Sequence, residues 1–180
     1  MASWVGLIIA KGKSKRLEGK NRRPFNGKAL FLWNTDKCRE IFSRVYISSD
    51  DDNILGEAEW VGAIPIKRPI ELCGDTPNIP VYQHALQFMN GVDGIVAVQA
   101  NSPNIKSKLI EIAKELLEKG FQEIMTMHED GSIYGSIWAI STKRLREYGD
   151  PYKPKPEVLL LDRSIDIHTE DDFQKAQCQK

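Results

Sequence analysis

A run of basic side chains near the start of the chain has the composition of an anion-binding loop. Between residues 11 and 23, glycines and a serine alternate with the cations Lys11, Lys13, Lys15, Arg16, Lys20, Arg22 and Arg23. Glycine lets backbone amides approach phosphate oxygens closely, and cationic side chains neutralise a triphosphate and its leaving group. The pattern predicts a polyphosphate site, and a solvated basic loop is the alternative.

The order of residues in this loop excludes the two most familiar phosphate-binding motifs. The chain has neither the glycine spacing of a Walker A loop nor the Gly-x-Gly-x-x-Gly pattern of dinucleotide-binding folds at this position. A polyphosphate site here must therefore be of another kind.

Asp166 and His168 form a second candidate group near the end of the chain. In an extended segment their side chains lie on one face, opposite the isoleucines at 165 and 167, and they can share a metal ion. Magnesium prefers oxygen ligands to imidazole nitrogen. Three interpretations of His168 stay open: a ligand of a softer ion such as manganese, a contact for a ligand phosphate, or a polar residue before a helix that Thr169 caps.

Short apolar runs and amphipathic segments predict the elements that position these groups. We expect strands at 5–10, 45–48, 64–67, 95–99, 123–127, 137–140 and 158–161, and helices at 81–89, at 105–119 and from Thr142. This alternation predicts one domain over residues 1–180, with a three-layer, Rossmann-like α/β fold and a mixed, mostly parallel sheet. Ligands of such sheets bind beyond the carboxyl ends of strands, where the basic loop begins.

Six blocks in order along nearly the whole chain resemble the acylneuraminate cytidylyltransferases, the CMP-sialic acid synthetase family. They lie at 10–21, 24–30, 48–51, 68–72, 99–103 and 164–173. The first reads Ala10-Lys11-Gly12-Lys13-Ser14-Lys15 and then Gly19-Lys20-Asn21, and the last begins Ser164-Ile165-Asp166-Ile167-His168-Thr169. The resemblance implies a fold of the nucleotide-diphospho-sugar transferase type. It also implies transfer of CMP from CTP to the anomeric hydroxyl of a sialic-like 2-keto-3-deoxy sugar acid, with release of pyrophosphate.

The resemblance also implies a role for each matching residue. The nucleotide-binding set would be Lys11, Gly12, Ser14, Lys15, Lys20, Asn21, Arg68 and Asn78. Within it Arg68 would contact the base and Asn21 would lie near the ribose, while Gln99 would face the acceptor sugar. Asp166 and His168 would hold Mg²⁺, or Mn²⁺, and Lys11, Lys20 and Asp166 would be catalytic. Structural alternatives are an exposed loop arginine at 68, a strand-end glutamine at 99 and a helix cap at Ser48.

The chain departs from the family pattern at several points. Lys11 stands where the family has arginine, which binds phosphate with a planar fork. His168 replaces an aspartate, and Asn104 with Ile105 removes another cation. The connection near 128–135 lacks the family's dimerisation insertion, so we expect a monomer or an atypical homodimer. Use of another nucleoside triphosphate, or a nucleotide-binding module without catalysis, is the alternative function.

The overall composition limits the partners of this protein. Lys plus Arg and Asp plus Glu both total 25, so no net charge favours binding to nucleic acid or a membrane. Three cysteines without paired spacing indicate reduced thiols. The early apolar run at 4–10 is too short for a membrane span or a secretory signal. We expect a cytoplasmic enzyme whose partners are CTP and a keto sugar acid.

Overall fold

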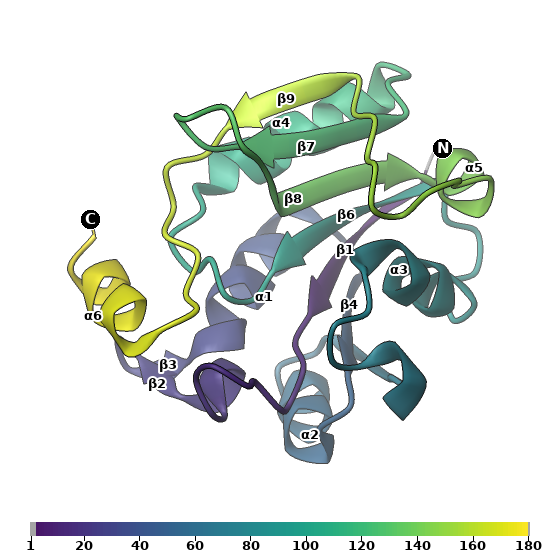
Figure 1. Cartoon of the computed structure of the whole chain (residues 1–180). Helices are drawn as coiled ribbons and strands as arrows, with labels where there is room; N and C mark the ends of the chain where they lie inside the picture. Colours follow the sequence, from purple (N-terminus) through teal and green to yellow (C-terminus); the bar gives the residue numbers. More distant parts are fainter. Residues whose placement is uncertain (1–2, 180) are drawn as a thin grey trace.

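A twisted seven-stranded sheet forms the centre of the computed structural model, which describes residues 3–179 (Figure 1). The strand order is β5-β4-β1-β6-β8-β7-β9. Their bounds are Trp4–Ile9 for β1, Val45–Ser49 for β4, Ile64–Lys67 for β5, Gly94–Gln99 for β6, Glu123–Met127 for β7, Ile133–Ser141 for β8 and Val158–Leu161 for β9. Only β8 runs against its neighbours in this sheet. The predicted mixed, mostly parallel sheet is confirmed.

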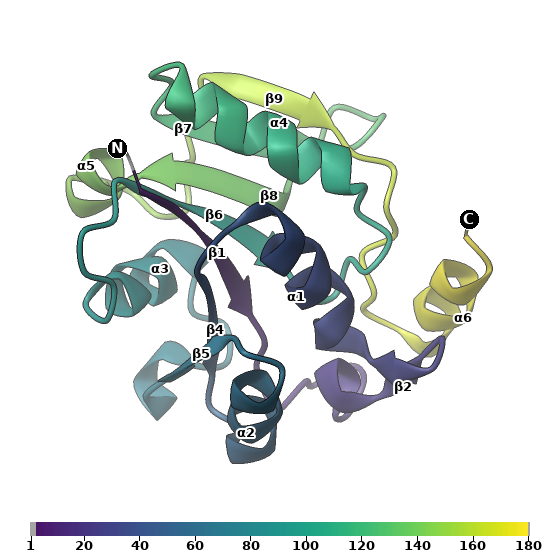
Figure 2. The same ribbon diagram turned by 180° about the vertical axis from the view of Figure 1, so that it is seen from behind.

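Helices cover both faces of the sheet and make it the middle of three layers. Helices α1 (Leu30–Ile41), α2 (Asp52–Trp60) and α4 (Ser107–Glu118) pack on one face, which Figure 2 shows. Helices α3 (Asn78–Leu86) and α5 (Thr142–Arg146) pack on the other. The near-continuous apolar character of β1 and β6 follows from this double burial. The predicted α/β class is therefore confirmed.

A third, smaller cluster holds the end of the chain against its beginning. Helix α6 (Glu170–Cys178) packs its Phe173 against Phe25, with the rings edge to face and their centroids 5.4 Å apart. Phe25 belongs to a small hairpin of β2 (Pro24–Phe25) and β3 (Lys28–Ala29) that follows a short 3-10 turn, η1 (Lys20–Arg22). The segment before α6 thereby lies beside the basic loop.

The predicted strands agree with the observed ones to within about a residue, except for β8. That strand begins at Ile133 rather than 137, because a tight turn at 128–132 joins it directly to β7. The helix predicted at 81–89 begins at Asn78 instead. Pro80 lies in its first turn, where the missing amide hydrogen costs no helical hydrogen bond. Among residues 3–179, no helix is both long and apolar enough to cross a membrane.

Candidate active site

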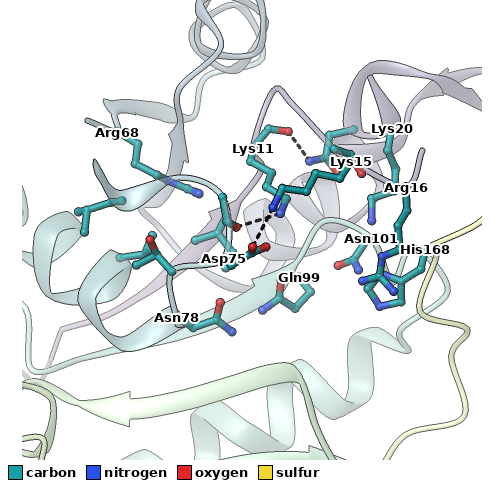
Figure 3. Close-up of a pocket in the computed structure, with 17 residues that line it drawn as sticks. Lys11, Lys15, Arg16, Lys20, Arg68, Asp75, Asn78, Gln99, Asn101 and His168 are labelled. Atoms are coloured by element: carbon teal, nitrogen blue, oxygen red, sulfur yellow. Dashed lines mark hydrogen bonds and ion pairs between the residues drawn. The ribbon is translucent and has the colours of Figure 1, made fainter. Parts of the chain in front are cut away.

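A cavity of about 550 Å³ opens where β1 and β6 end, as expected for a sheet of this kind (Figure 3). Its wall combines the loop after β1, the segment from Arg68 to α3, the end of β6 and the segment before α6. Nine of the residues singled out from the sequence line it: Lys11, Ser14, Lys15, Lys20, Asn21, Arg68, Asn78, Gln99 and His168. Gly12 lines a neighbouring hollow formed by the same loop, and Asp166 contacts His168 without being among the residues that line the cavity.

The start of the basic loop is fixed by two aspartates that follow β4. The Gly12 amide donates to Asp50 Oδ1 at 2.8 Å. A Cβ atom at Gly12 would lie only 2.6 Å from the Cβ of Asp51, so no larger residue fits there without movement. Asp51 also caps α2 by accepting from the Asn53 amide, and therefore the proposed cap at Ser48 is wrong. The loop leaves β1 in a defined direction.

The cations of the loop divide between two environments. Lys11 Nζ donates to the carbonyl of Gly74 at 3.2 Å, and Lys15 pairs with Asp75 at 2.8 Å. Lys20 is buried instead, and its Nζ donates to the carbonyl of Ile167 at 2.5 Å. Burial lowers the pKa of Lys20 to about 8, against the opposing field of Asp166. The cavity thus holds an exposed lysine, Lys15, a half-buried lysine, Lys11, and a desolvated lysine, Lys20.

Arg68 forms one end of the cavity and is almost completely buried. Its Nε donates to Ser48 Oγ at 3.1 Å and its Nη2 to the Ser48 carbonyl at 2.7 Å. Burial lowers the pKa of this guanidinium from its ordinary value. The alternative of an exposed loop arginine at 68 is therefore wrong: Arg68 is a fixed donor, and Asn78 lines the same cavity.

The opposite end of the cavity gathers Gln99, Asn101 and His168 (Figure 3). Asn101 Nδ2 donates to Asp166 Oδ1, and His168 Nε2 contacts Asp166 Oδ2. Asp166 and His168 therefore share a face as predicted, with Ile167 buried on the other side. Burial lowers the pKa of His168, although Asp166 acts in the opposite direction. The predicted cap of α6 is also present, because Thr169 and Asp172 form a capping box.

The donor atoms at this end fit a metal ion only in part. Among residues 3–179, no three His, Cys, Asp or Glu side chains converge. Magnesium commonly takes one or two carboxylates and completes its shell with phosphate and water oxygens, so Asp166 fits such an ion if one of its oxygens exchanges its present partner. The imidazole of His168 fits manganese better than magnesium. Asp166, with or without His168, is the group here that could hold a divalent ion.

Several residues that line or support the cavity were not assigned a role from the sequence. Arg16 was visible in the basic run, and Asn101 lies in the block at 99–103. Asp75 and Thr76 carried no signal, since only the fold brings the 72–76 segment opposite the basic loop. Tyr134 also carried no signal in the sequence. Its hydroxyl lies 3.2 Å from Ser102 Oγ, and burial together with the charge of Asp166 raises its pKa.

The chain is similar to known cytidylyltransferases. A family model described as Cytidylyltransferase matches residues 5–164. A pseudaminic acid cytidylyltransferase of Campylobacter jejuni is 24% identical over 215 aligned positions, covering 94% of this chain and 93% of that protein. Two solved structures share the fold: a CMP:2-keto-3-deoxy-manno-octonic acid synthetase complexed with CTP (TM-score 0.80, 12% identity, 98% of each chain) and a Mycobacterium tuberculosis protein complexed with manganese (TM-score 0.74, 14% identity, 99% of this chain and 100% of that one).

Proposed function

The chain belongs to the cytidylyltransferase family, and we propose that it transfers CMP from CTP to the anomeric hydroxyl of a sialic-like 2-keto-3-deoxy sugar acid, releasing pyrophosphate. One observation carries this proposal. In a single cavity the ammonium ends of Lys11 and Lys15 lie between a fixed guanidinium, Arg68, and the polar group of Asn101, while Lys20 lies at the Asn101 end (Figure 3). Such an order suits a base at one end, phosphates in the middle and an acceptor sugar at the other end.

The nucleotide would bind by exchange of contacts that the loop makes within the protein. Lys11 and Lys15 would leave the Gly74 carbonyl and the Asp75 carboxylate for phosphate oxygens, which are stronger partners for ammonium groups. Arg68 has a guanidinium nitrogen free of the bonds to Ser48, and it would donate to an acceptor atom of cytosine. Asn21 has a buried side-chain oxygen without a partner, which would accept from a ribose hydroxyl.

The reaction itself needs position and charge neutralisation more than covalent help from the protein. The anomeric hydroxyl would attack the α-phosphorus, and the bond to the pyrophosphate oxygen would break. Lys20 lies buried beside Ile167, between the loop and the Asp166 segment, where its ammonium group would stabilise the charge that develops at the phosphorus. A divalent ion, when bound, supplies further neutralisation of the phosphates, and Asp166 would hold it.

The relatives and the short β7–β8 turn support a proposal about the acceptor site. The Campylobacter jejuni relative acts on pseudaminic acid by its name, and the comparison extends over 215 positions although this chain has only 180 residues. That relative therefore has segments without a counterpart here. With the turn at 128–132 in place of a longer insertion, we propose a monomer or an atypical homodimer whose sugar site is built mainly from one chain.

Two measurements test this proposal. A thermal-shift panel of CTP, UTP, GTP and ATP with Mg²⁺ or Mn²⁺ should show selective stabilisation by CTP, because ligand binding to the folded state alone raises its stability. Pyrophosphate release is then measured with pseudaminic acid and 2-keto-3-deoxy-manno-octonic acid. Lys20→Met should abolish release, whereas Lys119→Met, an exposed lysine after α4, should not. Selective stabilisation by GTP, ATP or UTP would make that nucleotide, instead of CTP, the proposed substrate. Nucleotide binding without pyrophosphate release would indicate a nucleotide-binding module.

A further inference from the structure

The turn after β6 carries the groups that define the acceptor end of the cavity. Gln99 and Asn101 both line the cavity there. Asn101 also joins this turn to the segment before α6, because its carbonyl accepts from the Ile167 amide at 2.8 Å and its side chain contacts Asp166. Any displacement of the turn at 99–103 would therefore move the polar groups that face an acceptor.

Asn34 lies directly beneath this turn, on α1, and is fully buried. Its Nδ2 donates to the carbonyl of Gln99 at 2.8 Å and to the carbonyl of Ser102, also at 2.8 Å. Its Oδ1 accepts from Lys37 Nζ at 3.0 Å, and Lys37 in turn donates to the Pro103 carbonyl. Both hydrogens and the oxygen of the Asn34 side-chain amide thus form hydrogen bonds. Each bond goes to the turn itself or to Lys37, the second side chain that supports the turn.

The Gln99 and Ser102 carbonyls lie at or beyond the end of β6. The pairing of β6 with β8 ends at Val98, so the Gln99 carbonyl lies beyond that ladder, although Gln99 stays in register with Ile9 of β1 on the other side. The turn's own amides reach the same oxygens only at longer distances, 3.4 Å from Ser102 to Gln99 and 3.3 Å from Ile105 to Ser102. A buried carbonyl without a good donor is costly, and Asn34 supplies the shorter bonds.

We infer that Asn34 is a positioning residue for the acceptor sugar: its amide fixes the backbone at 99–103 and thereby the places of Gln99 and Asn101. The inference rests on the proposed function, because it takes the Gln99 end of the cavity to be the acceptor end. Asn34 itself is not among the residues that line the cavity, and the proposed nucleotide groups Lys11 and Arg68 form their hydrogen bonds with Gly74 and Ser48. A substitution at Asn34 should therefore change the KM of the acceptor sugar and leave the affinity for CTP unchanged.

A comparison of the KM of the sugar acid with the Kd of CTP tests this inference. Asn34→Asp keeps the volume and the acceptor for Lys37 but places a carboxylate oxygen against two carbonyl oxygens. We expect the KM of the sugar acid to rise about tenfold or more, since small misplacements of reacting groups have large effects. The Kd of CTP, measured by calorimetry without acceptor, should stay within about twofold. Thr35→Val is the matched control, because Thr35 is equally buried on α1 but bonds only to the Phe31 carbonyl of its own helix.

A second variant and a second readout keep the test decisive. Lys37→Met removes the other side chain that supports the turn and should also raise the KM of the acceptor, by a smaller factor than Asn34→Asp. This variant tests the inference even if Asn34→Asp folds poorly. In Asn34→Asp, amide hydrogen exchange at Ser102 and Ile105 should be faster than in the wild type, and this measurement needs no turnover. A parallel loss of CTP affinity, or unchanged KM and exchange, would overturn the role of Asn34. If the wild type releases no pyrophosphate with either acid, the proposed function fails and the acceptor role of Asn34 fails with it; faster exchange in Asn34→Asp would then show only that Asn34 fixes the turn.

Discussion

The ammonium group of Lys20 donates to the main-chain carbonyl of Ile167, a residue 147 positions later in the chain. This bond joins the basic loop to the segment that carries Asp166 and His168. It also keeps the Lys20 side chain in a buried position, where few water molecules can solvate its charge. In the site that we propose, polyphosphate affinity would therefore depend on a proton that this lysine holds less tightly than an exposed lysine does.

We predict that CTP affinity decreases above about pH 8 because of Lys20. Its pKa is lowered to about 8 by burial, so the ammonium form dominates only below that pH. A bound triphosphate stabilises the charged form and raises this pKa. Affinity should hence be full about one pH unit or more below the pKa of free Lys20, and above that pKa it should fall by up to about tenfold per pH unit until the pKa of the complex is reached. Calorimetric Kd values between about pH 7 and 9.5 measure this slope.

The control for this pH dependence is Lys20→Arg, whose guanidinium stays protonated over the whole range. Its CTP Kd should be nearly independent of pH, whatever its absolute value. An unchanged slope in Lys20→Arg would assign the titration to another group.

The sequence predicts local features of this site better than the contacts between distant segments. The basic loop and Gln99 follow from residue types placed at strand ends. The burial of Arg68 against Ser48 does not, because those residues meet only when β4 and β5 pair. The same holds for Asp75, which faces Lys15 across the cavity although 60 positions separate them. Periodicity contains no information on such pairs.

We predict that Asp75→Asn strengthens CTP binding. Asp75 competes with phosphate for Lys15, and its removal leaves that ammonium group free. The gain should be small, about two- to threefold at low salt, because both partners are largely exposed and exposed ion pairs are weak. It should diminish as salt rises. Asp171→Asn is the control: it breaks a comparable exposed pair with Lys175, on α6. A larger Kd for CTP in Asp75→Asn would instead indicate that Asp75 is part of the binding site.

We predict that Glu123→Ala destabilises the fold without affecting nucleotide binding. Glu123 is fully buried at the start of β7, where it accepts from Trp138 Nε1 at 3.1 Å, Tyr148 Oη at 2.7 Å and Arg144 Nε at 3.1 Å. The change leaves these donors without their common partner, and the free energy of unfolding should fall by roughly 3 kcal/mol. Urea unfolding measures the loss. Glu118→Ala, in an exposed pair with Lys114, should cost less than about 0.5 kcal/mol.

We predict that the wild type uses manganese better than magnesium and that His168→Asp narrows the difference. His168 lies against Asp166, so an ion held there meets one carboxylate and one imidazole, a set that suits Mn²⁺ better than Mg²⁺. An aspartate at 168 would place two carboxylates together, which repel one another until a hard cation binds between them. Metal-dependent rises in Tm with CTP present, and rates of pyrophosphate release, measure the preference. His168→Asn is the control, because it removes the imidazole without adding charge. Equal use of both ions by the wild type would exclude His168 as a ligand and leave Asp166 as the protein's own contribution to the ion.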